Sequence, residues 1–256
     1  MTDADFIVLD VDGGAMLRTC IDSIKRQTIK PHRIIVFDNG SRTPVQLRDA
    51  DVFRSEENLG FTGGVNAAFA HVMAPFVALV NNDVVLDDDW LAIVLEAMRD
   101  EQVAAVQTIL RRNSTTLDGA GIDISDGTYR QTLDFKHAWG VSATATLYRV
   151  EALGNHVFDP RFFAYYEDVE LCARLHEGGW KCVVVPVVKA THRGSQTAPL
   201  LGRDAVRLRT RNRYWVARMH RGVGRISALL WEDMKLLARG RSSLRGIIEG
   251  LCSTLS

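Results

Sequence analysis

The residue types best suited to chemistry in this chain gather in short polar clusters. Asn81, Asn82 and Asp83 directly follow an apolar run at 76–80. Carboxylate and amide oxygens are the ligands that a hard divalent cation prefers, and such a cation also binds phosphates. A turn of this composition is often only a polar turn, so its place after an apolar run is what favours a metal site.

A second cluster sets carboxylates beside aromatic rings. Glu167 and Asp168 follow Tyr165 and Tyr166, and Glu170 lies two residues further on. Apolar surroundings raise the pKa of a carboxyl group and suit it to proton transfer. The dipole of a helix also favours acids in its first turn, so a structural and a chemical role are compatible here.

Two weaker signals remain. Residues 58–66 form a glycine-rich entry into a helix, where free backbone N–H groups attract phosphate. This stretch matches neither of the common phosphate-loop patterns, so a simple capped helix is the alternative. His192 follows the apolar run 183–188. Its imidazole is suited to a metal site, although a lone histidine is more often structural.

The elements that must position these clusters alternate between strand and helix. Helical spacing of apolar residues predicts helices at 17–24, from Thr62 onward, at 90–98 and from about 167 to the glycines at 178–179. Apolar runs predict strands at 6–9, 34–37, 76–80, 103–109 and 183–188, and residues 111–138 lack periodicity and suggest loops or a small hairpin. Such alternation is typical of a parallel sheet, which binds ligands beyond the carboxyl ends of its strands. The clusters at 38–41 and 81–83 fall at such ends.

Composition limits the classes of protein. The chain has 256 residues, no net charge and 46% hydrophobic residues, which suits one large α/β domain or a domain with an appendage and excludes a disordered or fibrous chain. Four scattered cysteines argue against a zinc ribbon or a disulfide framework and favour a reducing, cytoplasmic compartment. We expect no signal peptide, and no apolar run approaches the roughly 20 residues that span a bilayer.

The charge is unevenly distributed along the chain. Residues 203–256 contain 12 Lys and Arg against 4 Asp and Glu, and the remaining residues contain 19 against 27. Apolar stripes at helical spacing within 226–237 and 244–255 accompany the basic residues. This pattern fits a helix on an anionic lipid surface, packing against the rest of the chain, or contact with a second subunit. Nucleic-acid binding is disfavoured because the body of the protein is net acidic.

The order and spacing of these motifs over about residues 5–200 resemble the family 2 glycosyltransferases of GT-A fold, and within them the bacterial rhamnosyltransferase-like enzymes of polysaccharide and cell-wall assembly. The resemblance implies an α/β fold in which helices flank a Rossmann-like, mostly parallel central sheet. We expect residues 1–202 to form the nucleotide-sugar-binding and catalytic domain. Residues 203–256 would be a basic, helical C-terminal extension.

The resemblance also implies roles for individual residues. The catalytic residue would be Asp168, as general base, with Glu167 as the fallback, and Trp139 and Gly140 would shape the acceptor pocket. The metal ligands would be Asn81, Asp83 and His192, holding Mg²⁺ or Mn²⁺. The nucleotide-sugar site would contain Asp10, Asp38, Asn58, Gly60, Gly64, Asn66, Asn82 and Asp83, with Asp38 at the nucleotide base.

Two departures from the family pattern affect the donor site. Asp10, Val11 and Asp12 stand where relatives usually have Thr-Tyr-Asn, so an aromatic ring is lost and two charges are added. Asn81 replaces the usual first acid of the D-x-D element, which removes one charge and should weaken metal affinity.

The expected reaction is an inverting transfer of a sugar from a nucleoside diphosphate sugar to a hydroxyl of a glycan or polyprenyl-linked acceptor. A non-catalytic nucleotide-sugar- or carbohydrate-binding protein is the alternative. A sugar nucleotidyltransferase is a weaker one, because residues 10–14 lack the basic side chains of those enzymes. A polyprenyl-linked acceptor would make contact with the inner face of the cell membrane useful. The sequence leaves open the sugar, the nucleotide, the acceptor, the linkage and the oligomeric state.

Overall fold

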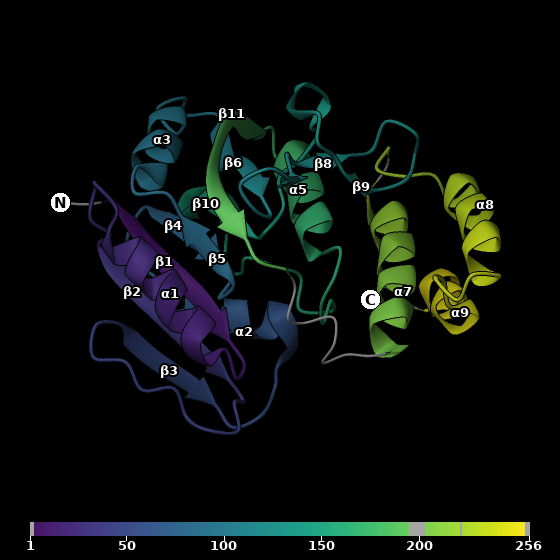
Figure 1. Ribbon diagram of the computed structural model, residues 1–256. Helices are drawn as coiled ribbons and strands as arrows, with labels where there is room; N and C mark the ends of the chain where they lie inside the picture. The colour runs from purple at the N-terminus through teal and green to yellow at the C-terminus, as the bar shows by residue number, and fades with distance from the viewer. Residues whose placement is uncertain (1–2, 195–202, 221, 254–256) are drawn as a thin grey trace.

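A computed structural model describes residues 3–194, 203–220 and 222–253 (Figure 1). Within these residues, a nine-stranded sheet has the strand order β3-β2-β1-β4-β10-β6-β11-β5, with β7 paired to β6. Most strands share one direction, namely β3 (Asp51–Ser55), β2 (Arg33–Asn39), β1 (Ala4–Asp10), β4 (Phe76–Val80), β6 (Val103–Arg111) and β11 (Lys181–His192). The opposing strands are β10 (Ala145–Arg149), β5 (Val84–Leu86) and β7 (Leu117–Gly119). The predicted α/β fold with a mostly parallel sheet is confirmed.

Helices cover both faces of the sheet. One face carries α1 (Gly14–Lys25) and α3 (Trp90–Ala97), and the other carries α2 (Gly60–Phe69), α4 (Val150–Leu153) and α5 (Glu167–Glu177). Each face therefore buries its own apolar core. The central strands β1 and β4 are apolar at nearly every position because they contribute to both cores.

The parallel register brings separate polar segments to one rim. Asp10 at the end of β1 pairs with Asp38 at the end of β2, and β4 ends beside β1 at Val80. The antiparallel strand β10 starts at this same rim, because Ala145 pairs with Val80. Carboxyl ends of the parallel strands and the entry into β10 therefore surround one region.

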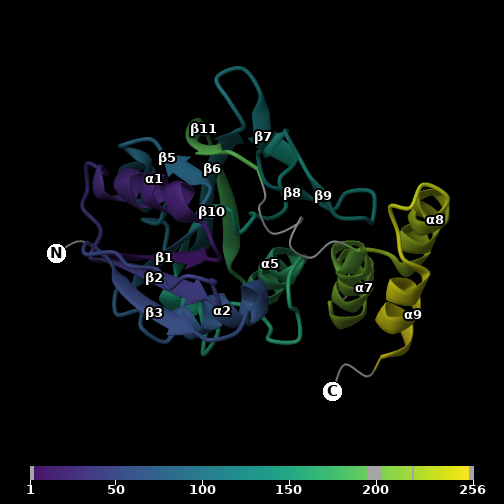
Figure 2. The ribbon, with the colours of Figure 1, turned by 60° about the horizontal axis from the view of Figure 1, so that its bottom comes forward.

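The C-terminal helices pack on this domain. They are α7 (Arg203–Met219), α8 (Ile226–Leu237) and α9 (Leu244–Cys252), and Figures 1 and 2 show α7 between α5 and the α8–α9 pair. A third apolar core joins Tyr214 and Val216 of α7 to Val169 of α5 and to Phe162, which lies just before that helix. Of the alternatives left open by the sequence, packing against the rest of the chain is thus observed for α7.

A buried acid holds the three C-terminal helices together. Asp233 of α8 is fully buried and accepts hydrogen bonds from Arg213 and Tyr214 of α7 and from Ser242, just before α9. A buried carboxylate is tolerated when donors surround it in this way. The basic residues of this extension thus serve partly to pair internal acids.

Residues 111–138, predicted as loops or a hairpin, contain β7 and the hairpin of β8 (Ile122–Asp123) and β9 (Arg130–Gln131).

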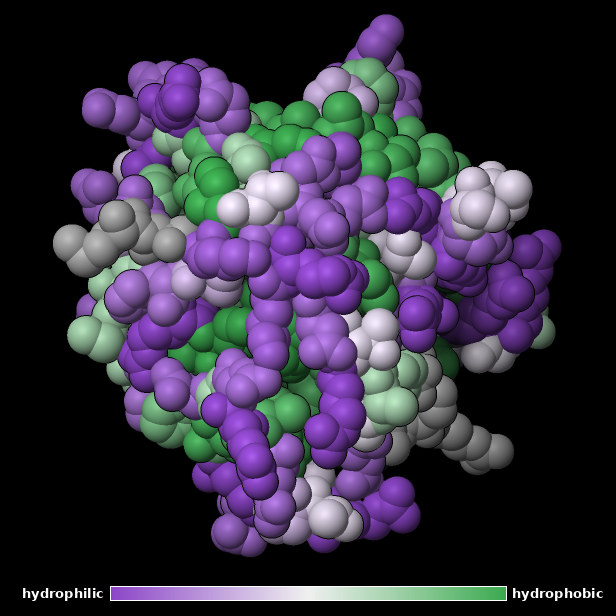
Figure 3. Space-filling model, turned by 60° about the vertical axis from the view of Figure 1, so that its left-hand side comes forward, coloured by the Kyte–Doolittle hydropathy of each residue, from purple (hydrophilic) through white to green (hydrophobic). Residues whose placement is uncertain are grey.

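The predicted domain boundary at 202/203 borders residues 195–202, which lie outside the described part of the chain, so it stays a prediction. Among the described residues, no helix is both long and apolar enough to cross a bilayer. On the face that brings α1 forward, polar side chains are interleaved with apolar ones (Figure 3).

Candidate active site

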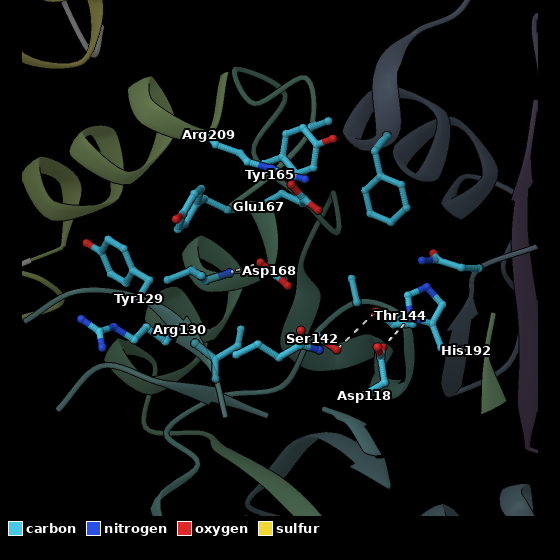
Figure 4. Close-up of a pocket in the computed structure, with 18 of the residues that line it drawn as sticks. Asp118, Tyr129, Arg130, Ser142, Thr144, Tyr165, Glu167, Asp168, His192 and Arg209 are labelled. Atoms are coloured by element: carbon cyan, nitrogen blue, oxygen red, sulfur yellow. Dashed lines mark hydrogen bonds and ion pairs between the residues drawn. The ribbon is translucent and has the colours of Figure 1, made fainter. Parts of the chain in front are cut away.

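A cavity of about 510 Å³ opens at the rim where the strands end (Figure 4). Its walls come from the end of β4, the start of β10, the end of β11, the first turn of α5, the β8–β9 hairpin and α7. The polar and charged residues that line it are Asn81, Arg112, Asp118, Arg130, Gln131, Ser142, Thr144, Glu167, Asp168, His192 and Arg209. The cavity is therefore lined by segments that are far apart in the chain, from Phe61 to Arg209.

His192 lies between two carboxylates on one wall. Its Nδ1 atom is 2.6 Å from Oδ2 of Asp118, and its Nε2 atom is 3.3 Å from Oδ2 of Asp83. Burial by itself would lower the pKa of His192, but the interactions with Asp83 and Asp118 outweigh burial and raise it. Asp118 also binds Arg112, with an oxygen–nitrogen distance of 2.6 Å. This wall is thus a pre-formed cluster of charged groups.

The same wall suits a divalent cation only in part. Oδ2 of Asp83 and Nε2 of His192 are buried and, apart from their ion pair with each other, have no hydrogen-bond partner, so a cation between them would find both atoms available. Asn81 lines the same cavity. Among the described residues, no group of three His, Cys, Asp or Glu side chains converges as a metal site. Mg²⁺ in phosphate-binding sites often takes one or two carboxylates and completes its shell with phosphate oxygens and water, so these residues fit that mode.

Glu167 and Asp168 form the opposite wall. Both begin α5, directly after Tyr165 and Tyr166, whose φ angles of 72° and 68° lie in the left-handed region. Bulky residues rarely adopt this conformation, which costs free energy and is common at functional sites. Asp168 accepts a hydrogen bond from the Val169 N–H at 2.9 Å, and Oε2 of Glu167 has no partner.

The two acids are poised to titrate at different pH. Burial raises the pKa of Asp168 to about 6, against the favourable effect of backbone hydrogen bonds. Burial and then the charge of Asp168 raise the pKa of Glu167 to about 8. At neutral pH the pair therefore keeps one proton, and its ionised member is a stronger base than an ordinary carboxylate.

The side chains predicted to bind the nucleotide lie beside this cavity, outside its lining. Asp38 is fully buried and accepts hydrogen bonds from Arg54 and from the backbone of Ser41 and Val45. Burial raises the pKa of Asp38, but these hydrogen bonds outweigh it and leave the pKa below its ordinary value. Asp38 thus already has strong partners within the protein.

The departure at residues 10–12 has a structural explanation. Asp10 accepts a hydrogen bond from the side chain of Asn82 at 2.6 Å, which ties the end of β1 to the Asn81–Asp83 turn. Burial raises the pKa of Asp10 despite this bond. Asp12 binds Arg42, so the second charge is compensated.

The glycine-rich segment 58–66 makes its contacts mainly within the protein. Asn58 accepts hydrogen bonds from the Gly60 N–H and from the side chain of Asn39. A Cβ atom on Gly64 would come within 2.4 Å of Leu9, so glycine allows α2 to pack closely on β1. The side-chain amide of Asn66 forms hydrogen bonds with the backbone of residues 157–158. The helix itself begins at Gly60, two residues before the predicted start.

The predicted acceptor residues lie behind the cavity wall. The Trp139 carbonyl accepts a hydrogen bond from His176, and Gly140 packs against Cys172. Their neighbours Ser142 and Thr144 line the cavity instead.

Several lining residues were missed by sequence reasoning, and Asp118 and Arg209 are two of them. Asp118 is one of four acids in a stretch without periodicity, and only the pairing of β6 with β7 brings it to His192. Arg209 lies among many basic residues of the C-terminal segment. Its guanidinium stacks over the ring of Tyr165 at 4.2 Å, a contact that depends on the docking of α7.

Comparisons with known proteins agree with this architecture. The chain is similar to the mannosyltransferase PcManGT from Pyrobaculum calidifontis, solved in complex with GDP-Man and Mn²⁺, with a TM-score of 0.64 and 13% identity over 95% of this chain and 77% of that chain. It is also similar to S. aureus TarS 1–349, with a TM-score of 0.61 and 14% identity over 99% of this chain and 76% of that chain. Likeness at such low identity supports the fold, which is GT-A.

A search of the curated proteins finds no match. The model of Glycosyl transferase family 2 matches residues 11–157, which is more than half of the chain. The chain therefore belongs to glycosyl transferase family 2.

Proposed function

We propose that the protein is an inverting glycosyltransferase that moves a sugar from a nucleoside diphosphate sugar to a hydroxyl group of a glycan or lipid-linked acceptor. The observation that carries this proposal is one cavity with His192, which is paired to the buried Asp83, on one wall and the Glu167–Asp168 pair on the other. Its volume of about 510 Å³ is within the range of small-molecule sites. The family match ends at residue 157, so the roles of the later residues rest on this geometry.

The donor diphosphate would lie at the wall that contains His192, beside Asp83. These two side chains would hold Mg²⁺ or Mn²⁺, with Asn81 as a further oxygen ligand. The cation would neutralise charge on the departing diphosphate. The Mn²⁺ and GDP-Man in the PcManGT structure support a divalent cation and a nucleoside diphosphate sugar as ligands. The nucleotide would extend toward Asp10, Asp38, Asn58, Gly60, Gly64, Asn66 and Asn82.

The acceptor would enter beside Glu167 and Asp168. Asp168 takes the proton of the acceptor hydroxyl while that oxygen forms a bond to the anomeric carbon. The bond from the anomeric carbon to the diphosphate oxygen breaks, and its electron pair leaves with the diphosphate. One displacement of this kind inverts the anomeric configuration. Ser142 and Thr144, just beyond Trp139 and Gly140, are placed to orient the hydroxyl.

A donor screen tests the proposed function. The full chain would be incubated with GDP-mannose, UDP-glucose or dTDP-rhamnose, each with Mg²⁺ or Mn²⁺, and free nucleoside diphosphate would be measured. The rhamnose donor tests the rhamnosyltransferase-like subset directly. Release of nucleoside diphosphate supports a transferase, and formation of pyrophosphate identifies a nucleotidyltransferase. A donor that raises the melting temperature without any release identifies a binding protein.

We also propose that the outer faces of α8 and α9 contact an anionic lipid surface. Trp231, Met234, Leu244 and Ile248 are 61%, 66%, 62% and 54% exposed. Beside them, Lys235, Arg239, Arg241 and Arg245 are also exposed. Exposed apolar side chains with a basic surround are typical of interfacial helices. A lipid-linked acceptor would then be presented close to the active site.

Co-sedimentation with vesicles tests this contact. We expect binding to phosphatidylglycerol vesicles, weak binding to phosphatidylcholine vesicles, and loss of binding when Trp231→Ser and Met234→Ser are combined. The matched control is Met73→Ser, because Met73 is 76% exposed but lies outside α8 and α9. Equal binding by the double variant and the control would contradict the proposal, as would a dimer that buries this face.

A further inference from the structure

The turn that precedes Glu167 and Asp168 is held from two sides. On the donor side, the backbone N–H groups of Phe61 and Thr62 donate to the Phe163 carbonyl at 2.7 and 3.3 Å, and the Thr62 hydroxyl donates to the Phe162 carbonyl. These donors belong to the first turn of α2, within the glycine-rich entry. The carbonyls of residues 162 and 163 are therefore fixed to the donor side of the site.

The next two carbonyls are fixed by the C-terminal extension. Asn212 of α7 is fully buried, and its Nδ2 atom donates to the carbonyls of Ala164 and Tyr165 at 2.9 and 2.7 Å. Arg211 donates from Nε to Oδ1 of Asn212 at 2.8 Å, which orients the amide so that its NH₂ group points at the turn. Four consecutive carbonyls are thus satisfied, two by α2 and two by one side chain of α7.

These bonds coincide with the strained part of the backbone. Tyr165 and Tyr166 both have left-handed φ angles, and no glycine relieves the strain. A bulky residue persists in this region only when surrounding contacts determine its conformation. The Asn212 bonds, together with the stacking of Arg209 on the Tyr165 ring at 4.2 Å, supply such contacts. Immediately after the turn, Glu167 and Asp168 line the cavity (Figure 4).

Other contacts between α7 and the catalytic domain involve side chains and not the carbonyls of the turn. Trp215 packs against Phe162, and His220 contacts Glu170 and Glu177 of α5. They dock the helix, whereas Asn212 binds the carbonyls of the turn itself.

We propose that Asn212 is a positioning residue that holds the Tyr165–Tyr166 turn in the conformation from which Glu167 and Asp168 enter the cavity. Its effect on catalysis rests on the proposed role of Asp168 as general base. On this basis α7 belongs to the active site, and removal of the C-terminal extension would misplace the general base Asp168.

The test compares Asn212→Ala and Asn212→Leu, where Leu keeps the volume and removes the donor, with Arg218→Ala. Arg218 lies on the same helix, but its side chain donates to the carbonyls of Gly250 and Ser253 near the end of α9. Amide hydrogen exchange over residues 162–168 is measured in all variants, at a temperature where circular dichroism shows them folded. Nucleoside diphosphate release and donor affinity are measured on the same samples.

We expect both Asn212 variants to lose exchange protection at 164–168. We also expect kcat to fall about 10²-fold, the scale of a 1 Å misplacement, while donor affinity stays unchanged. Arg218→Ala should lower the melting temperature and leave both quantities as in the wild type. Wild-type protection and kcat in the Asn212 variants would overturn the inference, as would losses equal to those of Arg218→Ala. If the wild type releases no nucleoside diphosphate from any donor, the proposed function fails, and the exchange measurement alone decides the role of Asn212.

Discussion

Asp168→Asn should stabilise the protein above pH 6 while it nearly abolishes sugar transfer. Asparagine has the same shape and can still accept the hydrogen bond from the Val169 N–H, so the change removes little besides the charge. Burial raises the pKa of Asp168 from its ordinary 3.8 to about 6. Between these values the folded state binds more protons than the unfolded state. Wild-type stability therefore falls as pH rises through this window and stays lowered above it.

The size of the effect follows from the two pKa values. A gap of about two pH units corresponds to about 3 kcal/mol, since each unit is worth about 1.4 kcal/mol. The carboxyl faces a cavity that water enters, so we expect about 1–3 kcal/mol at pH 8 and about 0 kcal/mol at pH 4. Loss of the base should lower the transfer rate about 10²–10⁴-fold.

Urea unfolding of the wild type and of Asp168→Asn at several values between pH 4 and pH 8 measures this difference. Asp22→Asn is the control, because Asp22 is exposed on α1 and its replacement should change stability little at any pH. A variant that is no more stable than the wild type at pH 8 would refute the burial argument. So would a stability gain of the same size at pH 4 and pH 8.

Three further variants test other parts of the account. Burial raises the pKa of Glu167 to about 8, so this group is protonated at pH 7 and Glu167→Gln should keep activity there. The variant should also lose any change of rate near pH 8. A large loss of initial rate at pH 7 would make Glu167 the base. Gly60→Ala should lower stability in urea by about 1–3 kcal/mol, since φ is +76° and the new Cβ would lie 2.6 Å from the Phe163 carbonyl oxygen; an unchanged midpoint would contradict this. Asp233→Ala should cost about 3–5 kcal/mol by removing the buried partner of Arg213, which would keep only its contact with the half-buried Glu232, whereas Asp204→Ala on the surface should cost little; equal proteolysis of the two variants would contradict it.

The sheet and its rim were predictable because the central strands are apolar and end in polar clusters. The run at 76–80 is β4, and Asn81 to Asp83 follow it as expected. β3 was not predicted, because it is an edge strand with Asp51 and Arg54 in a short, partly exposed segment. β10 was also not predicted, since five residues in an irregular stretch show no clear period.

The site was predictable to the level of its acids and no further. Glu167 and Asp168 stood out by residue type and the role of His192 came from the family resemblance, but Asp118 reaches His192 only through strand pairing. Asn66 was predicted to bind the nucleotide sugar, but its side-chain amide binds the backbone of residues 157–158. Residue type alone does not tell these two uses of an amide apart. Nothing in the sequence indicated a role for Asn212, because its contacts with the Tyr165–Tyr166 turn depend on how α7 docks.

Calorimetric titration of a donor identified in the screen, with and without Mn²⁺, tests the central claim most directly. The claim is that one cavity joins a cation-dependent diphosphate site at Asp83 to a base at Asp168. We predict that Asp83→Ala loses the Mn²⁺-dependent part of donor affinity, and that Asp168→Asn binds the donor as the wild type does but no longer transfers sugar. Undiminished Mn²⁺ dependence in Asp83→Ala, or wild-type transfer by Asp168→Asn, would contradict the account.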